Sequence, residues 1–266
     1  MSRSLEGVRL KLNRAAEHLQ QLDEENRVYL EGKPYEVIHE RDEERSRHVY
    51  RFRVRQPPPL RLSILMGDCL HNIRSGLDYL AWQLVLAEGG TPTIKTSFPI
   101  FKDEGKFREF KGGRKAPTGV VGGISEEAAA HIETLQPYNR TEGPPEGHAL
   151  WVLHTLNNID KHRHLNLTTL GTTNTQTTLT DAAGHPIFAI QLLDQPAGAG
   201  PVEDGAEIAA FPILDDHEKK VQMQGAAFVA LEEAQALAHS PISSVAEASL
   251  EFVRDTVIPA FEPYFD

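Results

Sequence analysis

The chain has 266 residues, of which 40% are hydrophobic and 24% are charged, so it can build a sizeable packed core, and its composition argues against global disorder. Its 27 Lys and Arg against 38 Asp and Glu give a formal net charge of −11, which argues against long-range attraction to nucleic acid, because phosphate binding depends on Lys and Arg. The single cysteine excludes an internal disulfide and a multi-cysteine zinc site.

The N-terminal third predicts a long helix followed by a β-hairpin. Apolar residues recur at helical spacing over residues 4–31, and Gly32 and Pro34 end this pattern. Residues 35–40 and 47–55 are rich in β-formers and flank a charged turn. The first residues lack the apolar stretch of a signal peptide, and no run approaches the roughly 18 apolar residues that span a bilayer. We therefore expect a cytoplasmic protein with no membrane partner.

The middle of the chain predicts three more helices separated by loops. The first is the central helix 60–88, with an apolar stripe of Leu70, Ile73, Leu77, Leu80 and Leu84. In residues 89–123 the apolar residues follow no persistent periodicity, and this segment is expected to cross the surface without regular secondary structure. Short and medium helices are expected at 125–135, with Ser125 as N-cap, and at 148–162.

The last third predicts an antiparallel sheet and a closing helix. Thr-, Val- and Ile-rich runs at 165–170, 176–180, 186–193, 207–212 and 220–229 suit a meander of four or five strands. A helix is expected at 243–261. The fold class is thus α+β, a single domain over 1–266. Residues 1–164 and 242–266 form its helical core with the hairpin 35–55, and residues 165–230 form its β region.

The most informative feature is a strip of ionisable side chains on the central helix. At about 100° per residue, His71 and Asp78 project along nearly one line, with Arg74 about 40–60° away, at the border of the apolar stripe. Such a strip is either a buried polar network or a reactive site. Arg74 and Asp78 are also spaced for a simple i,i+4 ion pair.

Two other helices carry polar residues that could converge on this strip. Residues 4–31 include His18, and the helix 148–162 brings Asp160 and His162. His18 alone is typical of a core histidine, and the Asp160–His164 run could be no more than a helix end that complements the dipole. Asp160, His162 and His164 have the spacing of a weak candidate metal site. No other cofactor motif occurs, and we expect none.

Aromatic and basic residues have simpler interpretations. Trp82 and Trp151 are expected as core anchors. The segments 41–55 and 102–115 are rich in Lys and Arg and could supply a local basic groove, but acidic residues within both favour a solvated face.

Three stretches carry a family resemblance: Gly67-Asp-Cys-Leu-His-Asn-Ile-Arg-Ser-Gly-Leu-Asp-Tyr-Leu-Ala-Trp82, Leu135-Gln-Pro-Tyr138, and Leu150 to Arg163 with its Asn-Ile-Asp-Lys-His-Arg motif. Together they resemble a group of bacterial proteins to which we can attach no activity. The chain is also loosely similar to HEPN domains, helical bundles that often dimerise and cleave RNA without metal through an Arg-x(4–6)-His motif. Here Tyr79 follows Arg74-Ser-Gly-Leu-Asp78 where that motif has histidine. The departure replaces the histidine that would serve as general acid or base in that motif.

Three hypotheses follow for the function. The first is a HEPN-like protein that binds or acts on RNA or nucleotide phosphates, using Arg74 and Asp78 with His71, His18 or His162. The second is a non-catalytic binding protein with a structural polar network, and the third is a small-molecule or metal-dependent enzyme. Convergence of these side chains on one pocket would favour an enzyme. A homodimer is expected through helix 4–31 or 243–261, because Val253, Val257, Ile258, Phe261 and Phe265 look like surplus apolar surface.

Overall fold

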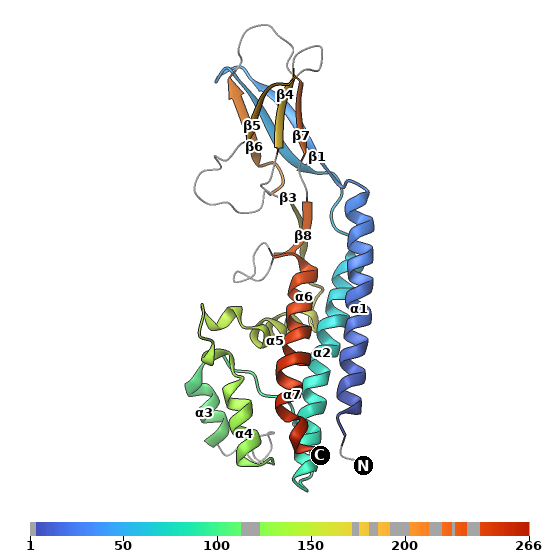
Figure 1. The fold of residues 1–266 in the computed structure, drawn as a ribbon, viewed down its shortest axis with the longest axis vertical. Coiled ribbons are helices and arrows are strands. Elements are labelled where there is room, and N and C mark those ends of the chain that lie inside the picture. The colour runs from blue at the N-terminus through green and yellow to red at the C-terminus, as the bar shows by residue number, and fades with distance from the viewer. Residues whose placement is uncertain are drawn as a thin grey trace.

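The computed structural model is an elongated α+β molecule with helices at one end and strands at the other (Figure 1). It describes residues 4–112, 123–171, 176–180, 186–191, 203–212, 220–224, 227–232 and 240–265. Parts of the expected strands 186–193 and 220–229, and of the basic segment 102–115, lie outside these residues. In the part that is described, no helix is long and apolar enough to cross a membrane.

Four helical segments form the body of the molecule. Helix α1 (Glu6–Glu31) packs along α2 (Leu60–Ala87), and α5 (Ala149–Asp160) and α6 (Ile242–Glu251) pack against α2 from its other sides. The apolar stripe of α2 is buried as its periodicity predicts, with Leu70, Ile73 and Leu77 completely inaccessible to solvent. This helix is therefore the centre of the core.

The segment expected to be irregular contains a helix of its own. Helix α3 (Glu104–Gly112) is short and highly charged, and it is held by the fully buried Phe107. Helix α4 (Glu126–Thr134) follows, and the Ser125 hydroxyl accepts the Ala128 N–H as the predicted N-cap. Helix α5 begins after His148 and ends at Asp160, two residues earlier than expected.

The strands do not form the expected meander. Strands β1 (Tyr35–Asp42) and β2 (Arg47–Val54) make the predicted hairpin, which β6 (Glu207–Pro212) extends to a three-stranded sheet. Strand β4 (Gln176–Thr180) lies between β5 (Pro186–Gln191) and β7 (Lys220–Gln224). Strands β3 (Leu167–Gly171) and β8 (Ala227–Leu231) pair near the helices. All strand pairs are antiparallel. Together the strands form three small sheets instead of one meander.

The C-terminal helix is buried within one copy of the chain. After α6 the backbone widens to a π-helical stretch (Phe252–Val257) and returns to α-helix in α7 (Ile258–Phe261). The widened turn lies just before Pro259, a residue that cannot donate a helical hydrogen bond. Val253, Val257, Ile258 and Phe261 are all buried, and Phe265 is partly buried. These residues are therefore not the surplus apolar surface on which the expected dimer rested.

Candidate functional site

Arg74 and Asp78 form a clamp that fastens a loop to α2. The Arg74 Nη2 donates to Asp78 Oδ1 and to the Phe98 carbonyl, each at 2.8 Å, and the Phe98 N–H donates to the same Asp78 oxygen at 2.9 Å. Only 12% of the Arg74 side chain is exposed, against 36% for Asp78. Phe98 is itself buried and packs edge-on against Phe261. The predicted i,i+4 pair therefore exists, and it holds the chain after α2 against the core.

The electrostatics of this clamp reflect its burial. Burial raises the pKa of Asp78, and the charges of Arg74 and Lys161 and the Phe98 N–H partly offset that rise. Burial likewise lowers the pKa of Arg74, against the attraction of Asp78. The Arg74 Nη1 is buried and has no hydrogen-bond partner in the described part of the chain. The guanidinium thus serves the clamp and has little freedom to meet a ligand.

Asp160 and His71 lie farther along the contact between α2 and α5. The Asp160 carboxylate lies directly over Gly67, where a Cβ atom would collide with it. Burial raises the pKa of Asp160, and the nearby Asp68 raises it further, while His71 lowers it. His71 is exposed, with its Nε2 3.4 Å from the Ser75 hydroxyl. Glycine at position 67 is therefore what allows α5 to end close to α2.

His18 and His162 lie apart from the clamp. His18 is buried on α1, and its Nδ1 has no hydrogen-bond partner among the described residues. His162 follows α5 and lines a depression on the surface. Of the six predicted site residues, only Arg74 and Asp78 are hydrogen-bonded to each other in the part of the chain that the structure describes. The structure does not bring the six together in one pocket.

The depression beside His162 is the α5 groove, an open hollow of about 470 Å³. The groove is lined by seven residues of α5 and the turn after it: Trp151, His154, Thr155, Asn158, Ile159, His162 and Arg163. Trp151 packs against the hydrophobic core from a partly buried position, as expected of a core anchor, and Trp82 is also partly buried.

Polar and cationic groups surround the indole of the α5 groove. The Trp151 and His154 rings lie 5.4 Å apart between centroids, and the Lys102 Nζ lies 5.2 Å from the Trp151 ring. Asn158 Nδ2 is 3.0 Å from His154 Nε2, so the amide can donate to a neutral imidazole. The groove thus offers an aromatic surface edged by hydrogen-bonding groups, and the Lys102 ammonium over the indole is paired with Glu146 at 2.8 Å.

His154 is the group that sequence reasoning left out of the site. Burial lowers its pKa, and the positive charges of Arg74 and Lys161 lower it further. Burial and the two cations therefore favour the neutral form of the imidazole, which lies close enough to Arg74 to be affected by its charge. The available signal was the spacing of Trp151, His154, Asn158 and His162, which places them along one side of α5.

The three candidate metal ligands point to different places. Asp160 lies over Gly67, His162 lines the α5 groove, and His164 lines a separate pocket of about 280 Å³ with Pro58 and Ser63. Across the described residues, no group of three or more His, Cys, Asp or Glu side chains is placed to hold a metal ion. The geometry therefore gives the metal alternative no support.

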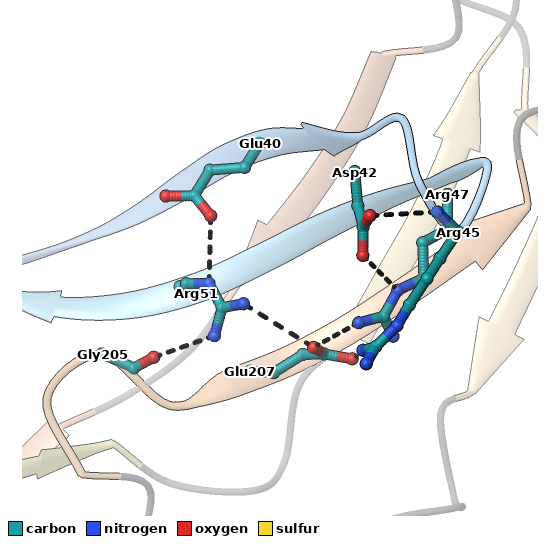
Figure 2. A network of polar contacts seen from close by, with 7 residues as sticks. All are labelled: Glu40, Asp42, Arg45, Arg47, Arg51, Gly205 and Glu207. Atoms are coloured by element: carbon teal, nitrogen blue, oxygen red, sulfur yellow. Dashed lines mark hydrogen bonds and ion pairs between the residues drawn. The ribbon is translucent and has the colours of Figure 1, made fainter.

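The arginines of the hairpin are engaged in an ion-pair network with acidic neighbours (Figure 2). Arg47 contacts Asp42 at 3.0 Å and Glu207 at 2.8 Å, and Arg51 contacts Glu40 at 3.0 Å and Glu207 at 3.9 Å. The carboxylates come from β1 and β6, on either side of β2. Because these charges are neutralised in place, this sheet is the solvated charged face expected of the first basic segment and not a basic groove.

Comparisons with known proteins add no identity to this geometry: no family model, no curated protein and no solved structure matches the chain.

Proposed function

We propose that the protein is a non-catalytic binding protein that takes a phosphate-bearing aromatic ligand, RNA or a nucleotide, in the α5 groove without a metal ion. The observation that carries the proposal is the grouping of Trp151, His154 and Asn158 with Arg163 in the α5 groove. Lys161 lies outside the lining but is near enough for its charge to act on His154. Exposed aromatic rings stack on bases, and nearby Lys and Arg attract phosphates. Such a grouping is notable in a chain whose formal net charge is −11.

The state of Arg74 favours binding over catalysis. Its guanidinium is nearly buried and donates to Asp78 and to the Phe98 carbonyl, so it acts as a structural cation. The predicted catalytic side chains are also dispersed over α1, α2 and the end of α5. HEPN-like identity remains part of this proposal, supported by the sequence motifs and by the bundle of α1, α2, α5 and α6. The cytoplasmic location expected from the sequence also remains part of it.

The proposal is tested by titrating a fluorescently labelled single-stranded RNA oligomer, and separately a labelled nucleotide, in chelator at several salt concentrations. Trp151→Ala should weaken binding by about 5- to 150-fold, since stacking on one aromatic ring is worth about 1–3 kcal/mol. Lys161→Glu should weaken binding and flatten the salt dependence, because one phosphate contact is lost.

The matched control is Arg41→Glu, which makes the same charge change on β1, at the far end of the molecule (Figure 1). This variant should bind as the wild type does. Absence of binding to both probes, or equal losses in Arg41→Glu and Lys161→Glu, would refute the proposal.

A second function, metal-free RNA cleavage, is favoured by His154, because burial and the charges of Arg74 and Lys161 lower its pKa. A histidine whose pKa is lowered by burial and by cations can accept a proton near neutral pH. This function predicts cleavage of RNA in chelator that is lost in His154→Gln while RNA binding is retained. Binding without cleavage in the wild type would leave the binding function alone.

A further inference from the structure

Helix α5 is capped at its N-terminus by a histidine. The His148 Nδ1 accepts the backbone N–H of Leu150 at 3.2 Å, and the His148 carbonyl accepts the N–H of Val152 at 3.0 Å. The residues preferred at this position are Ser, Thr, Asp and Asn, whose side-chain oxygens accept such a hydrogen bond at neutral and mildly acidic pH. An imidazole accepts it only while Nδ1 carries no proton. The cap of α5 therefore depends on the protonation state of His148.

The surroundings of His148 favour its neutral form. The ring is partly buried and packs edge-on against Phe252, with the ring centroids 4.9 Å apart. The Arg140 guanidinium lies against Gly147, the residue before His148, where a Cβ atom would collide with its Nη1. Burial lowers the pKa of His148 from its ordinary 6.5, and the charge of Arg140 lowers it further.

Neighbouring charges offer a protonated His148 little compensation. The Glu146 carboxylate, two residues before the cap, accepts a hydrogen bond from the Lys102 ammonium at 2.8 Å. The first turn of α5 contains no acidic residue. The N-terminus of a helix carries a partial positive charge, so the helix itself opposes an imidazolium at this position. Protonation therefore removes a hydrogen bond and adds a repulsion at the same point.

The capped turn carries the aromatic ring of the α5 groove. Trp151 is the third residue of α5, directly after Leu150, whose N–H the cap holds. The first N–H groups of a helix have no partner within the helix, so loss of the cap loosens the first turn. The Trp151 indole would then lose its position beside His154, whose ring centroid lies 5.4 Å away. A change at His148 thus reaches the groove, although His148 does not line it.

We propose that His148 is a pH-sensitive switch for the α5 groove, in which a proton on Nδ1 releases the first turn of α5 and displaces Trp151. While the imidazole is neutral, it caps the helix and the groove is formed. Once the imidazolium forms, Nδ1 can only donate, and the turn frays. The change in the helix follows from the cap alone, and its effect on a ligand rests on the proposed function.

Amide hydrogen exchange at Leu150 tests the switch in the helix. Between pH 7.5 and 4.5 the protection factor of this amide should fall by about 5-fold in the wild type, the factor that corresponds to loss of a typical N-cap. His148→Asn accepts the same hydrogen bond without titrating and should stay protected throughout, whereas His148→Ala should be about 5-fold less protected at every pH.

A second variant keeps the histidine and moves the midpoint of the switch. Arg140→Gln should shift the loss of Leu150 protection to higher pH, because it removes one of the two causes that oppose the proton. An equal fall in the wild type and in His148→Asn, or full protection of His148→Ala at pH 7.5, would overturn the proposal. Circular dichroism checks that each variant is folded.

Binding of the labelled nucleotide tests the effect on the groove. The phosphate and His154 also take up protons in this range, so the informative quantity is the ratio of the wild-type and His148→Asn dissociation constants at each pH. The ratio should be about 1 at pH 7.5 and should rise at pH 4.5, at most by the roughly 5- to 150-fold that stacking on one aromatic ring is worth.

The two measurements separate the switch from the proposed function. A ratio of about 1 at both pH values, in a protein that binds the nucleotide, would overturn the proposal and leave the proposed function standing. Absence of nucleotide binding together with a pH-dependent Leu150 amide would refute the proposed function and support the switch in the helix.

Discussion

Removal of the Asp78 carboxylate is expected to be among the most damaging single changes in the molecule. In Asp78→Ala the Arg74 cation keeps only the Phe98 carbonyl as a partner, and the Phe98 N–H loses its acceptor. Breaking a buried ion pair from one side costs about 3–5 kcal/mol, and the partial exposure of Asp78 places the expected loss at the lower end, about 3 kcal/mol. The melting temperature should fall by about 6–12 °C.

A double-mutant cycle in urea measures the interaction itself. Arg74→Ala should also destabilise the protein, and the double variant should lose less than the sum of the two losses, with a coupling of about 1–2 kcal/mol. The matched control is the i,i+4 pair Arg27–Glu31, whose side chains are 54% and 63% exposed and whose coupling should be far smaller. Equal coupling in the two cycles would show that Arg74 and Asp78 are an ordinary surface pair.

The remaining predictions concern packing and pH. Leu77→Ala should cost about 2–5 kcal/mol in chemical unfolding, because the completely buried side chain leaves a cavity; an unchanged stability would disprove the assigned core face of α2. Gly67→Ala should destabilise the native chain but stabilise the Asp160→Ala variant, because the three atoms nearest to the new methyl group all belong to the Asp160 carboxylate. Equal effects in both backgrounds would contradict this contact. The pKa of His154 is lowered in the folded state from its ordinary 6.5, so the unfolded chain binds more protons just below that pH. Stability should therefore fall as the pH falls from 7.5 through the folded pKa, and less steeply in His154→Gln.

The helices could be predicted well because their apolar residues repeat within the element. The stripe of α2 is continuous over eight turns, and its burial follows directly. Helix α3 escaped prediction because five of its nine residues are charged and two are glycine, and it depends on one anchor, Phe107. Apart from the β1–β2 hairpin, the strand partners could not be predicted, for another reason. The pairing of Arg47 with Pro212 joins residues far apart in the chain, and no local pattern encodes that partner.

In the candidate site, too, some contacts could be predicted from the sequence and others could not. The spacing of Arg74 and Asp78 predicted their ion pair, since both lie on one helix. Their third partner, the Phe98 backbone, belongs to a loop whose course no periodicity defines. His154 was a member of a polar cluster on α5, but its approach to Arg74 depends on how two helices pack. Contacts within an element, or between neighbouring strands such as β1 and β2, were therefore predictable, and contacts between elements distant in the sequence were not.

The place of Tyr79 in the structure bears on the resemblance to HEPN domains. Tyr79 packs beside Gly7 and under the Lys11 ammonium, on the side of α2 that faces α1. Arg74 points to the opposite edge, where it meets Asp78 and the loop that carries Phe98. A histidine at position 79 would therefore be separated from the Arg74 guanidinium by the width of the helix. Within one copy of the chain, the imidazole whose pKa is lowered by the charge of Arg74 belongs to His154 on α5, and not to the position that follows Asp78.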